Sequence, residues 1–126
     1  MRHARVWYVI GSALTMLVIV SSLVPSRDLP HLRVSDKVEH LVAYFGLALW
    51  FGGLVPLRRY LALALALALL MLGGGIEIAQ GLMGLGRDAD WRDFYADSLG
   101  AGLGLAVCMA GLRHWATWFE QWPKRR

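Results

Sequence analysis

Eight of the nine carboxylates in this chain lie at segment ends that can meet on one side of a membrane, and only Glu120 lies elsewhere. The eight are Asp28, Asp36, Glu39, Glu77, Asp88, Asp90, Asp93 and Asp97. Carboxylates can pair with cations, bind divalent metal ions or transfer protons. An ionisable group at the margin of hydrocarbon costs on the order of a few kcal/mol, so several together indicate ion pairing, a bound ligand or both.

Two pairs of polar residues have the spacing of a single helix face. Asp36 and His40 are four residues apart, at the start of an apolar stretch. Glu77 and Gln80 are three residues apart, near the end of another apolar stretch. Residues at these separations are neighbours on a helix surface. Each pair is therefore predicted to present two polar side chains side by side.

A third helix face combines acids with glycines. Asp90, Asp93 and Asp97 follow one another at positions i, i+3 and i+7. Gly100 and Gly104 continue the same stripe at a spacing that lets a second helix approach closely. This face is therefore predicted to be acidic near the membrane surface and closely packed deeper in, against a helix of the same chain or of a second copy.

Hydropathy predicts the elements that must position these residues. The chain is 57% hydrophobic with a mean hydropathy of +0.48, which is too apolar for an ordinary soluble domain. A spanning helix needs about 20 apolar residues. The predicted spans are residues 6–24, 38–55, 60–79 and 94–112, followed by an interfacial segment at 113–126. We therefore predict an all-α integral membrane protein, a single domain with four transmembrane helices in an antiparallel bundle.

The residue pattern of three segments is compatible with more than one structure. The alternating Leu-Ala run at 61–69 has the period of a strand, but both residues favour helix and a lone strand in lipid would leave its backbone unpaired. The first apolar stretch could be a cleaved signal peptide, but its length favours a retained span. The glycines at 73–75 are predicted to thin or loosen the third helix, and residues 81–86 are predicted to form an exit loop.

The distribution of basic residues orients the predicted bundle. With a cytoplasmic N-terminus, eight Lys and Arg residues lie inside and five outside. Counting the acids as well gives +7 inside and −3 outside. We therefore expect both termini to be cytoplasmic. The net charge of +4 then favours contact with membrane lipids, not with nucleic acid.

The polar motifs also carry a family resemblance. In chain order they are Asp36-Lys37-x-x-His40, Glu77-x-x-Gln80, Arg87, and Asp93-x-x-x-Asp97-x-x-Gly100-x-x-x-Gly104. Over about residues 34–104 this order resembles the VanZ-like family of small bacterial membrane proteins, which is named for an accessory protein of teicoplanin resistance. The resemblance implies a multi-pass protein of the bacterial cytoplasmic membrane, with glycopeptide resistance in some members. The family commonly has Asn where this chain has Asp97.

The predicted site comprises nine residues from three predicted spans and the connection before the last one. They are Asp36, Lys37, His40, Glu77, Gln80, Arg87, Asp90, Asp93 and Asp97. Tyr44, Trp91 and Tyr95 are expected to flank the apolar part of a ligand. No cofactor is predicted to be required, although a divalent cation at His40, Glu77 and Asp93 suits these ligand types.

Three functions are compatible with this set of residues. The first is binding of a polar ligand at the outer membrane boundary, in which Lys37 and Arg87 engage its phosphate or carboxylate. The expected ligands are lipid-linked cell-wall intermediates or lipoglycopeptides, with a contribution to teicoplanin-like resistance. The second is a structural ion-pair network in a membrane scaffold or assembly protein. The third, favoured least, is a metal-dependent enzyme acting on a lipid phosphate, and we assign no catalytic residues to it.

Overall fold

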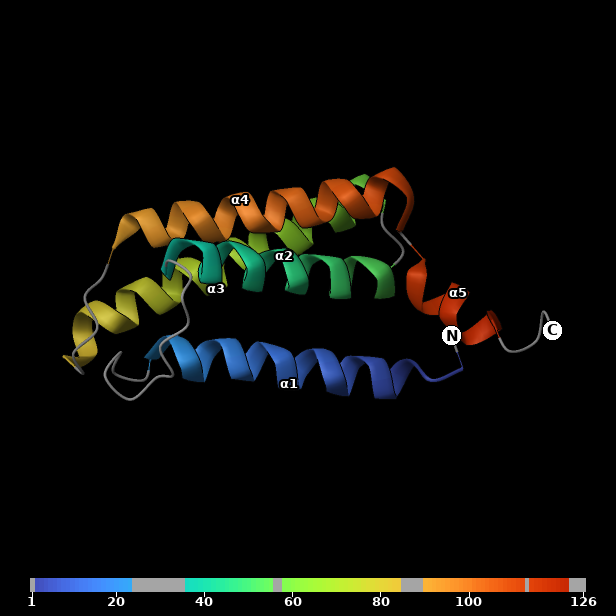
Figure 1. The fold of residues 1–126 in the computed structure, drawn as a ribbon, viewed down its shortest axis with the longest axis horizontal. Coiled ribbons are helices and arrows are strands. Elements are labelled where there is room, and N and C mark those ends of the chain that lie inside the picture. The colour runs from blue at the N-terminus through green and yellow to red at the C-terminus, as the bar shows by residue number, and fades with distance from the viewer. Residues whose placement is uncertain (1, 24–35, 56–57, 85–89, 113, 123–126) are drawn as a thin grey trace.

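Every element in the described part of the chain is a helix. The computed structural model describes residues 2–23, 36–55, 58–84, 90–112 and 114–122. The elements are α1 (Ala4–Leu23), α2 (Asp36–Leu54), α3 (Arg59–Met83), α4 (Trp91–Val107), a π-helical turn (Cys108–Leu112) and α5 (Trp115–Gln121). The first four run side by side along the long axis of the molecule, and the short α5 lies at one end (Figure 1).

Three of the helical segments are long and apolar enough to cross a membrane. They are Ala4–Leu23, Arg59–Met83 and Trp91–Leu112. The segment predicted as a further span, residues 38–55, falls on α2, which packs against α1, α3 and α4. Tyr44, Leu47 and Ala48 of α2 are almost completely buried in the core.

The third helix is longer than predicted. It continues through the three glycines and ends only at Met83, where Gly84 adopts the left-handed conformation that commonly terminates helices. The prediction that 81–86 forms an exit loop is therefore wrong for residues 81–83, which are helical, while 85–86 lie outside the described residues. Of the three glycines, Gly73 has a packing role, because a Cβ there would lie 2.9 Å from Asp97 Oδ2, whereas no atom lies within 4 Å of a Cβ placed on Gly75.

The glycine stripe of α4 lies directly on the backbone of α2. A Cβ on Gly104 would lie 2.6 Å from the carbonyl oxygen of Phe45 and 2.7 Å from Ala48 Cβ. A Cβ on Gly100 would clash with the carbonyl group of Leu41. Of the two packing partners considered for this face, the structure shows a helix of the same chain.

The opposite end of the bundle joins the two terminal helices. The carboxylate of Glu120 in α5 accepts hydrogen bonds from the backbone N–H of Arg2 at 2.7 Å and of His3 at 3.0 Å. It also accepts one from Trp7 Nε1 at 2.8 Å. The ring of Trp7 stands edge-on to that of Trp115, with centroids 5.4 Å apart. Part of the segment predicted to be interfacial thus forms a helix tied to the start of α1.

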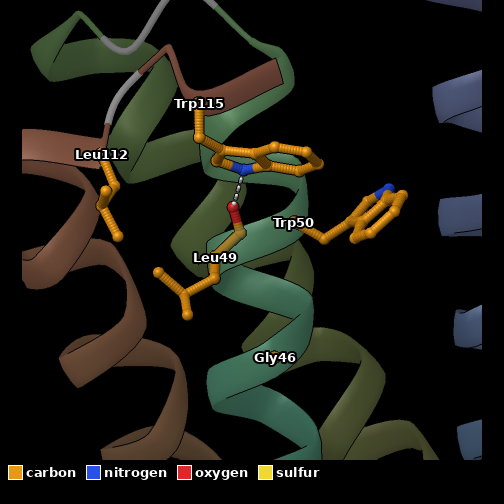
Figure 2. A pocket seen from close by; sticks show the side chains of 5 residues that line it. All are labelled: Gly46, Leu49, Trp50, Leu112 and Trp115. Carbon is orange, nitrogen blue, oxygen red and sulfur yellow. Dashed lines mark hydrogen bonds between the residues drawn. The ribbon is translucent and has the colours of Figure 1, made fainter. Parts of the chain in front are cut away.

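An apolar pocket of about 320 Å³ lies beside this junction. It is lined by Gly46, Leu49, Trp50, Leu112 and Trp115 (Figure 2). Trp115 Nε1 donates a hydrogen bond to the carbonyl oxygen of Leu49 at 2.9 Å, which fixes one wall of the pocket. The indole N–H of Trp115 is therefore satisfied by the backbone of α2, and the pocket presents mainly apolar surface.

Replacing Gly104 with Ala tests the contact between α4 and α2. The added methyl group would collide with backbone, so we expect the free energy of unfolding to fall by about 1–3 kcal/mol. The matched control is Gly102→Ala in the same helix, because no atom lies within 4 Å of a Cβ placed there. The control should be neutral or stabilising by up to about 1 kcal/mol, since Ala favours helix over Gly. Unfolding in mixed detergent micelles measures both, and equal effects would contradict this packing.

Candidate functional site

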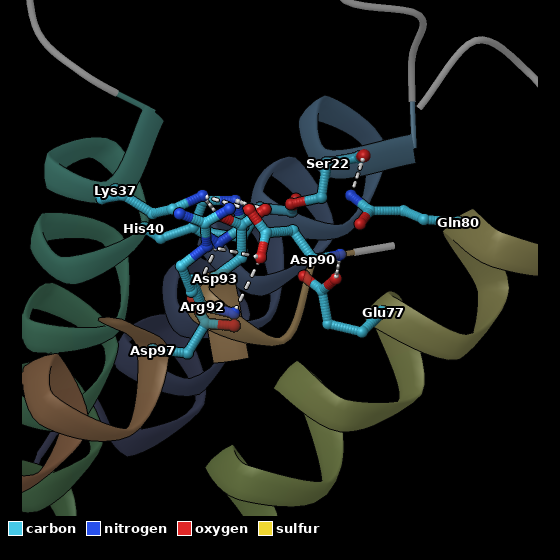
Figure 3. Close-up of polar contacts among 10 residues, drawn as sticks. Ser22, Lys37, His40, Glu77, Gln80, Asp90, Arg92, Asp93 and Asp97 are labelled. Carbon is cyan, nitrogen blue, oxygen red and sulfur yellow. Dashed lines mark hydrogen bonds and ion pairs between the residues drawn. The ribbon is translucent and has the colours of Figure 1, made fainter. Parts of the chain in front are cut away.

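Polar side chains from four helices meet at the end of the bundle farthest from α5 (Figures 1 and 3). This end contains the last turn of α1, the first turns of α2 and α4, and the last turns of α3. Local signals place the start of α4, because Asp90 is its N-cap and accepts a hydrogen bond from the Arg92 N–H at 2.9 Å. The predicted convergence of helix ends is therefore present.

The centre of the site is a buried histidine with two aspartates. His40 Nδ1 lies 2.7 Å from Asp97 Oδ1, and His40 Nε2 lies 3.7 Å from Asp93 Oδ2. The relative exposures of His40, Asp93 and Asp97 are only 7%, 5% and 2%. Burial of such groups is tolerated only where they are paired or hydrogen-bonded, so these contacts determine the arrangement of α2 against α4.

A more exposed ion-pair layer covers this centre. Lys37 Nζ lies 2.8 Å from Asp90 Oδ2 and also contacts Asp93 Oδ1. The side chains of Lys37 and Asp90 are about one-third exposed, whereas that of Asp93 is buried. The hydrogen bond from Lys37, helped by the Arg92 N–H, lowers the pKa of Asp90 to about 2. Lys37 thus joins an outer and an inner carboxylate.

Glu77 approaches from α3 with one oxygen satisfied and one without a partner. Its Oε2 accepts a hydrogen bond from the Asp90 N–H at 2.8 Å, while its Oε1 is buried and makes no hydrogen bond within the described part of the chain. The whole residue is only 1% exposed. Gln80, one turn further along α3, donates from Nε2 to the carbonyl oxygen of Ser22 at 2.7 Å, and its Oε1 also lacks a partner. The site therefore contains buried acceptors that a donor or a cation would satisfy.

Three of these residues have the arrangement of a metal-ligand group. One ligand atom from each of His40, Glu77 and Asp97 lies within 4.8 Å of the other two. The sequence predicted Asp93 in place of Asp97. Asp97 fills the third position because it lies one helical turn deeper, next to His40 Nδ1, whereas Asp93 contacts Lys37.

Two of the other predicted site residues have side chains that lie outside the described part of the chain, and three aromatic residues lie within it. Arg87 lies outside the described residues, and so does the side chain of Asp36, whose backbone begins α2. Tyr44 was expected to flank a ligand, but it is 1% exposed and belongs to the core, so that prediction is wrong. Trp91 and Tyr95 remain exposed at 58% and 69%.

Two participants were missed as members of the polar network. The carbonyl oxygen of Ser22 accepts a hydrogen bond from Gln80 Nε2, and this contact adds α1 to the site. The hydroxyl of Tyr44 is buried without a hydrogen-bond partner and interacts electrostatically with Asp97 and Glu77. Tyr44 lies four residues after His40, so the spacing of one helix face was the available signal. The contact of Ser22 could not be predicted in this way, because it is made by a backbone carbonyl group, which every residue has.

The site can bind cations with its acids and imidazole, and anions with Lys37. A proton can also pass between His40 and Asp97, which are in hydrogen-bonding contact. No family model, curated protein or solved structure matches this chain.

The Lys37–Asp90 pair should make stability depend on pH in the acid range. The pKa of Asp90 in the folded state, about 2, lies below its ordinary value near 3.8. The pair therefore stabilises the fold above about pH 4 and loses this contribution as the pH falls towards 2. We expect Asp90→Asn to lower the melting temperature above about pH 5, with the difference from wild type shrinking below pH 4. Melting curves in detergent across this range measure it, and a difference that persists at pH 2 would argue against the ion pair.

Proposed function

We propose that this chain is a multi-pass protein of the bacterial cytoplasmic membrane that binds a polar ligand at the outer membrane boundary. The ligand class is a lipid-linked cell-wall intermediate or a lipoglycopeptide, and the binding contributes to teicoplanin-like resistance. The observation that carries the proposal is the buried polar group formed by His40, Glu77, Asp93 and Asp97 beneath the partly exposed Lys37.

The chemistry of the group fits a ligand that carries both an anion and hydrogen-bond donors. Lys37 is partly exposed and contacts the buried Asp93, and it can turn from its carboxylates to a phosphate. Glu77 Oε1 and Gln80 Oε1 are buried acceptors without partners, which hydroxyl or amide N–H groups can satisfy. The exposed rings of Trp91 and Tyr95 lie on the first turns of α4, at a position suited to contact with acyl chains.

The proposal includes an orientation of the chain in the membrane. α2 serves as a fourth span within the bundle, and both termini lie in the cytoplasm. The excess of Lys and Arg at the end opposite the site supports this orientation. The polar site then faces the cell exterior or periplasm, where cell-wall intermediates and glycopeptides occur.

The resemblance to the VanZ-like family supports the ligand class. The motif residues His40, Glu77, Gln80, Asp93 and Asp97, separated in the sequence, lie in one polar region of the structure. This clustering is what a shared binding site at those motifs requires.

A structural role is the alternative with direct support in the geometry. The contacts of His40 with Asp97 and of Lys37 with Asp93 already join α2 to α4. Buried pairs of this kind commonly specify an arrangement of helices more than they stabilise it. On this alternative the chain is a scaffold or assembly protein without its own ligand. The second alternative, a metal-dependent enzyme acting on a lipid phosphate, requires an ion at the same residues.

Binding to a lipid-linked disaccharide-peptide in nanodiscs tests the proposal. We expect Lys37→Gln to weaken binding about tenfold, equivalent to about 1.4 kcal/mol, because a charge-assisted contact with phosphate is lost. The matched control is Arg92→Gln, since Arg92 is 83% exposed and its side chain contacts Oδ1 of Asp90, not the oxygen that Lys37 binds. The control should bind like wild type.

Two results would overturn the binding proposal. One is wild-type affinity for the lipid-linked compound no higher than for plain phospholipid nanodiscs. The other is an equal loss in Lys37→Gln and Arg92→Gln. A parallel measurement compares teicoplanin susceptibility in cells that express wild type or Asp93→Asn. If the variant loses melting temperature and the wild type binds no ligand, the structural alternative is sufficient.

A further inference from the structure

We infer that His40, Glu77 and Asp97 form a binding site for one divalent transition-metal ion, with zinc as the best-suited ion. The metal would occupy the polar site described above. This inference therefore rests on the proposed function in one respect, namely that this polar group binds a ligand. It specifies a ligand that the polar group binds by itself, whether or not a lipid headgroup is present.

The three ligands come from three different helices. His40 lies on α2, Glu77 on α3 and Asp97 on α4, and their ligand atoms lie within 4.8 Å of one another. One imidazole nitrogen and two carboxylate oxygens form a mixed donor set that suits zinc better than calcium or magnesium, which prefer oxygen alone. Three protein ligands also leave a coordination position for water or for an oxygen of a ligand.

The free oxygen of Glu77 is an independent sign that something is bound there. Glu77 is 1% exposed, and its Oε2 is held by the Asp90 N–H. Its Oε1 has no hydrogen-bond partner, and Figure 3 shows the carboxylate on the side of α3 that faces the cluster. An unsatisfied buried carboxylate oxygen is strongly unfavourable, and a cation at this point would satisfy it.

The negative charges of the site also favour a bound cation. Glu77, Asp93 and Asp97 are all buried, and Lys37 contacts Asp93 and Asp90. Within the described residues, Glu77 takes part in no ion pair. A divalent cation next to Glu77 and Asp97 would offset two negative charges at a depth where an unpaired carboxylate is costly.

The imidazole of His40 is already oriented for a metal ion. Its Nδ1 lies 2.7 Å from Asp97 Oδ1, so an ion bound by both would replace the proton that they share. Its Nε2 would then face Asp93 Oδ2, at 3.7 Å. A carboxylate on the far nitrogen of a metal-bound histidine fixes the ring and raises its basicity, and this is the role we assign to Asp93.

Metal analysis of the purified full-length chain tests this assignment. The protein carries a tag without histidines and is held in detergent, and bound metals are measured by mass spectrometry after gel filtration. We expect about one zinc ion per chain in wild type. Glu77→Gln and His40→Gln should lose it. Glu39→Gln, which removes a partly exposed carboxylate of α2 outside the nine residues of the site, should keep it.

Thermal melting of wild type gives a second readout that does not depend on folding of the variants. A chelator should lower the melting temperature and added zinc should restore it, because a ligand of the folded state stabilises that state. Cobalt should give the visible absorption of a low-symmetry site and be displaced by zinc. Absence of bound metal together with absence of any melting shift or cobalt spectrum would overturn the assignment, as would full zinc retention in both ligand variants.

The same samples separate this assignment from the proposed function. Binding of the lipid-linked compound that survives chelation in a metal-free wild type would leave the binding proposal intact and refute a metal requirement. Zinc that is bound stoichiometrically while the lipid-linked compound is not would retain the metal site and refute the lipid ligand. Each result therefore identifies which of the two ideas has failed.

Discussion

The close contact between α2 and α4 is the constraint on which the rest of the structure depends. Gly100 and Gly104 have no side chains, and the space is filled by the backbone of α2 at Leu41 and Phe45. Such contacts replace the hydrophobic driving force that helices lack inside lipid. They also bring the imidazole of His40 within hydrogen-bonding distance of Asp97. A wider separation of the two helices would break this hydrogen bond.

Polar groups are ordered by depth at this end of the bundle. Lys37 and Asp90 are partly exposed, and they cover the more deeply buried His40, Asp97 and Glu77. Exposed ion pairs contribute little to stability because water screens them, whereas buried groups are costly when any member lacks a partner. The buried group is therefore the part of the site whose members each need a partner, whereas the Lys37–Asp90 pair is partly exposed to solvent.

Helix spacing predicted much of this arrangement, but not its details. The separations of His40 from its helix start and of Asp93 from Asp97 were enough to predict shared faces and converging helix ends. They could not distinguish which of two carboxylates one turn apart would meet the imidazole, because that depends on the axial offset of α4 against α2. The length of α3 was missed because the glycine-containing run from residue 81 was read as a loop, whereas the left-handed conformation that ends the helix occurs only at Gly84.

The hydrogen bonds of Glu120 have a consequence for how the chain assembles. Its carboxylate holds the backbone of Arg2 and His3, which lie 118 and 117 residues earlier in the chain. The first helix therefore leaves the ribosome long before its partner exists. Until α5 has been translated, α1 lacks these hydrogen bonds and is held by its contacts with the middle helices. A chain truncated before α5 would keep its polar site but lose the three hydrogen bonds of Glu120, and its first helix would then be held mainly by α2 and α3.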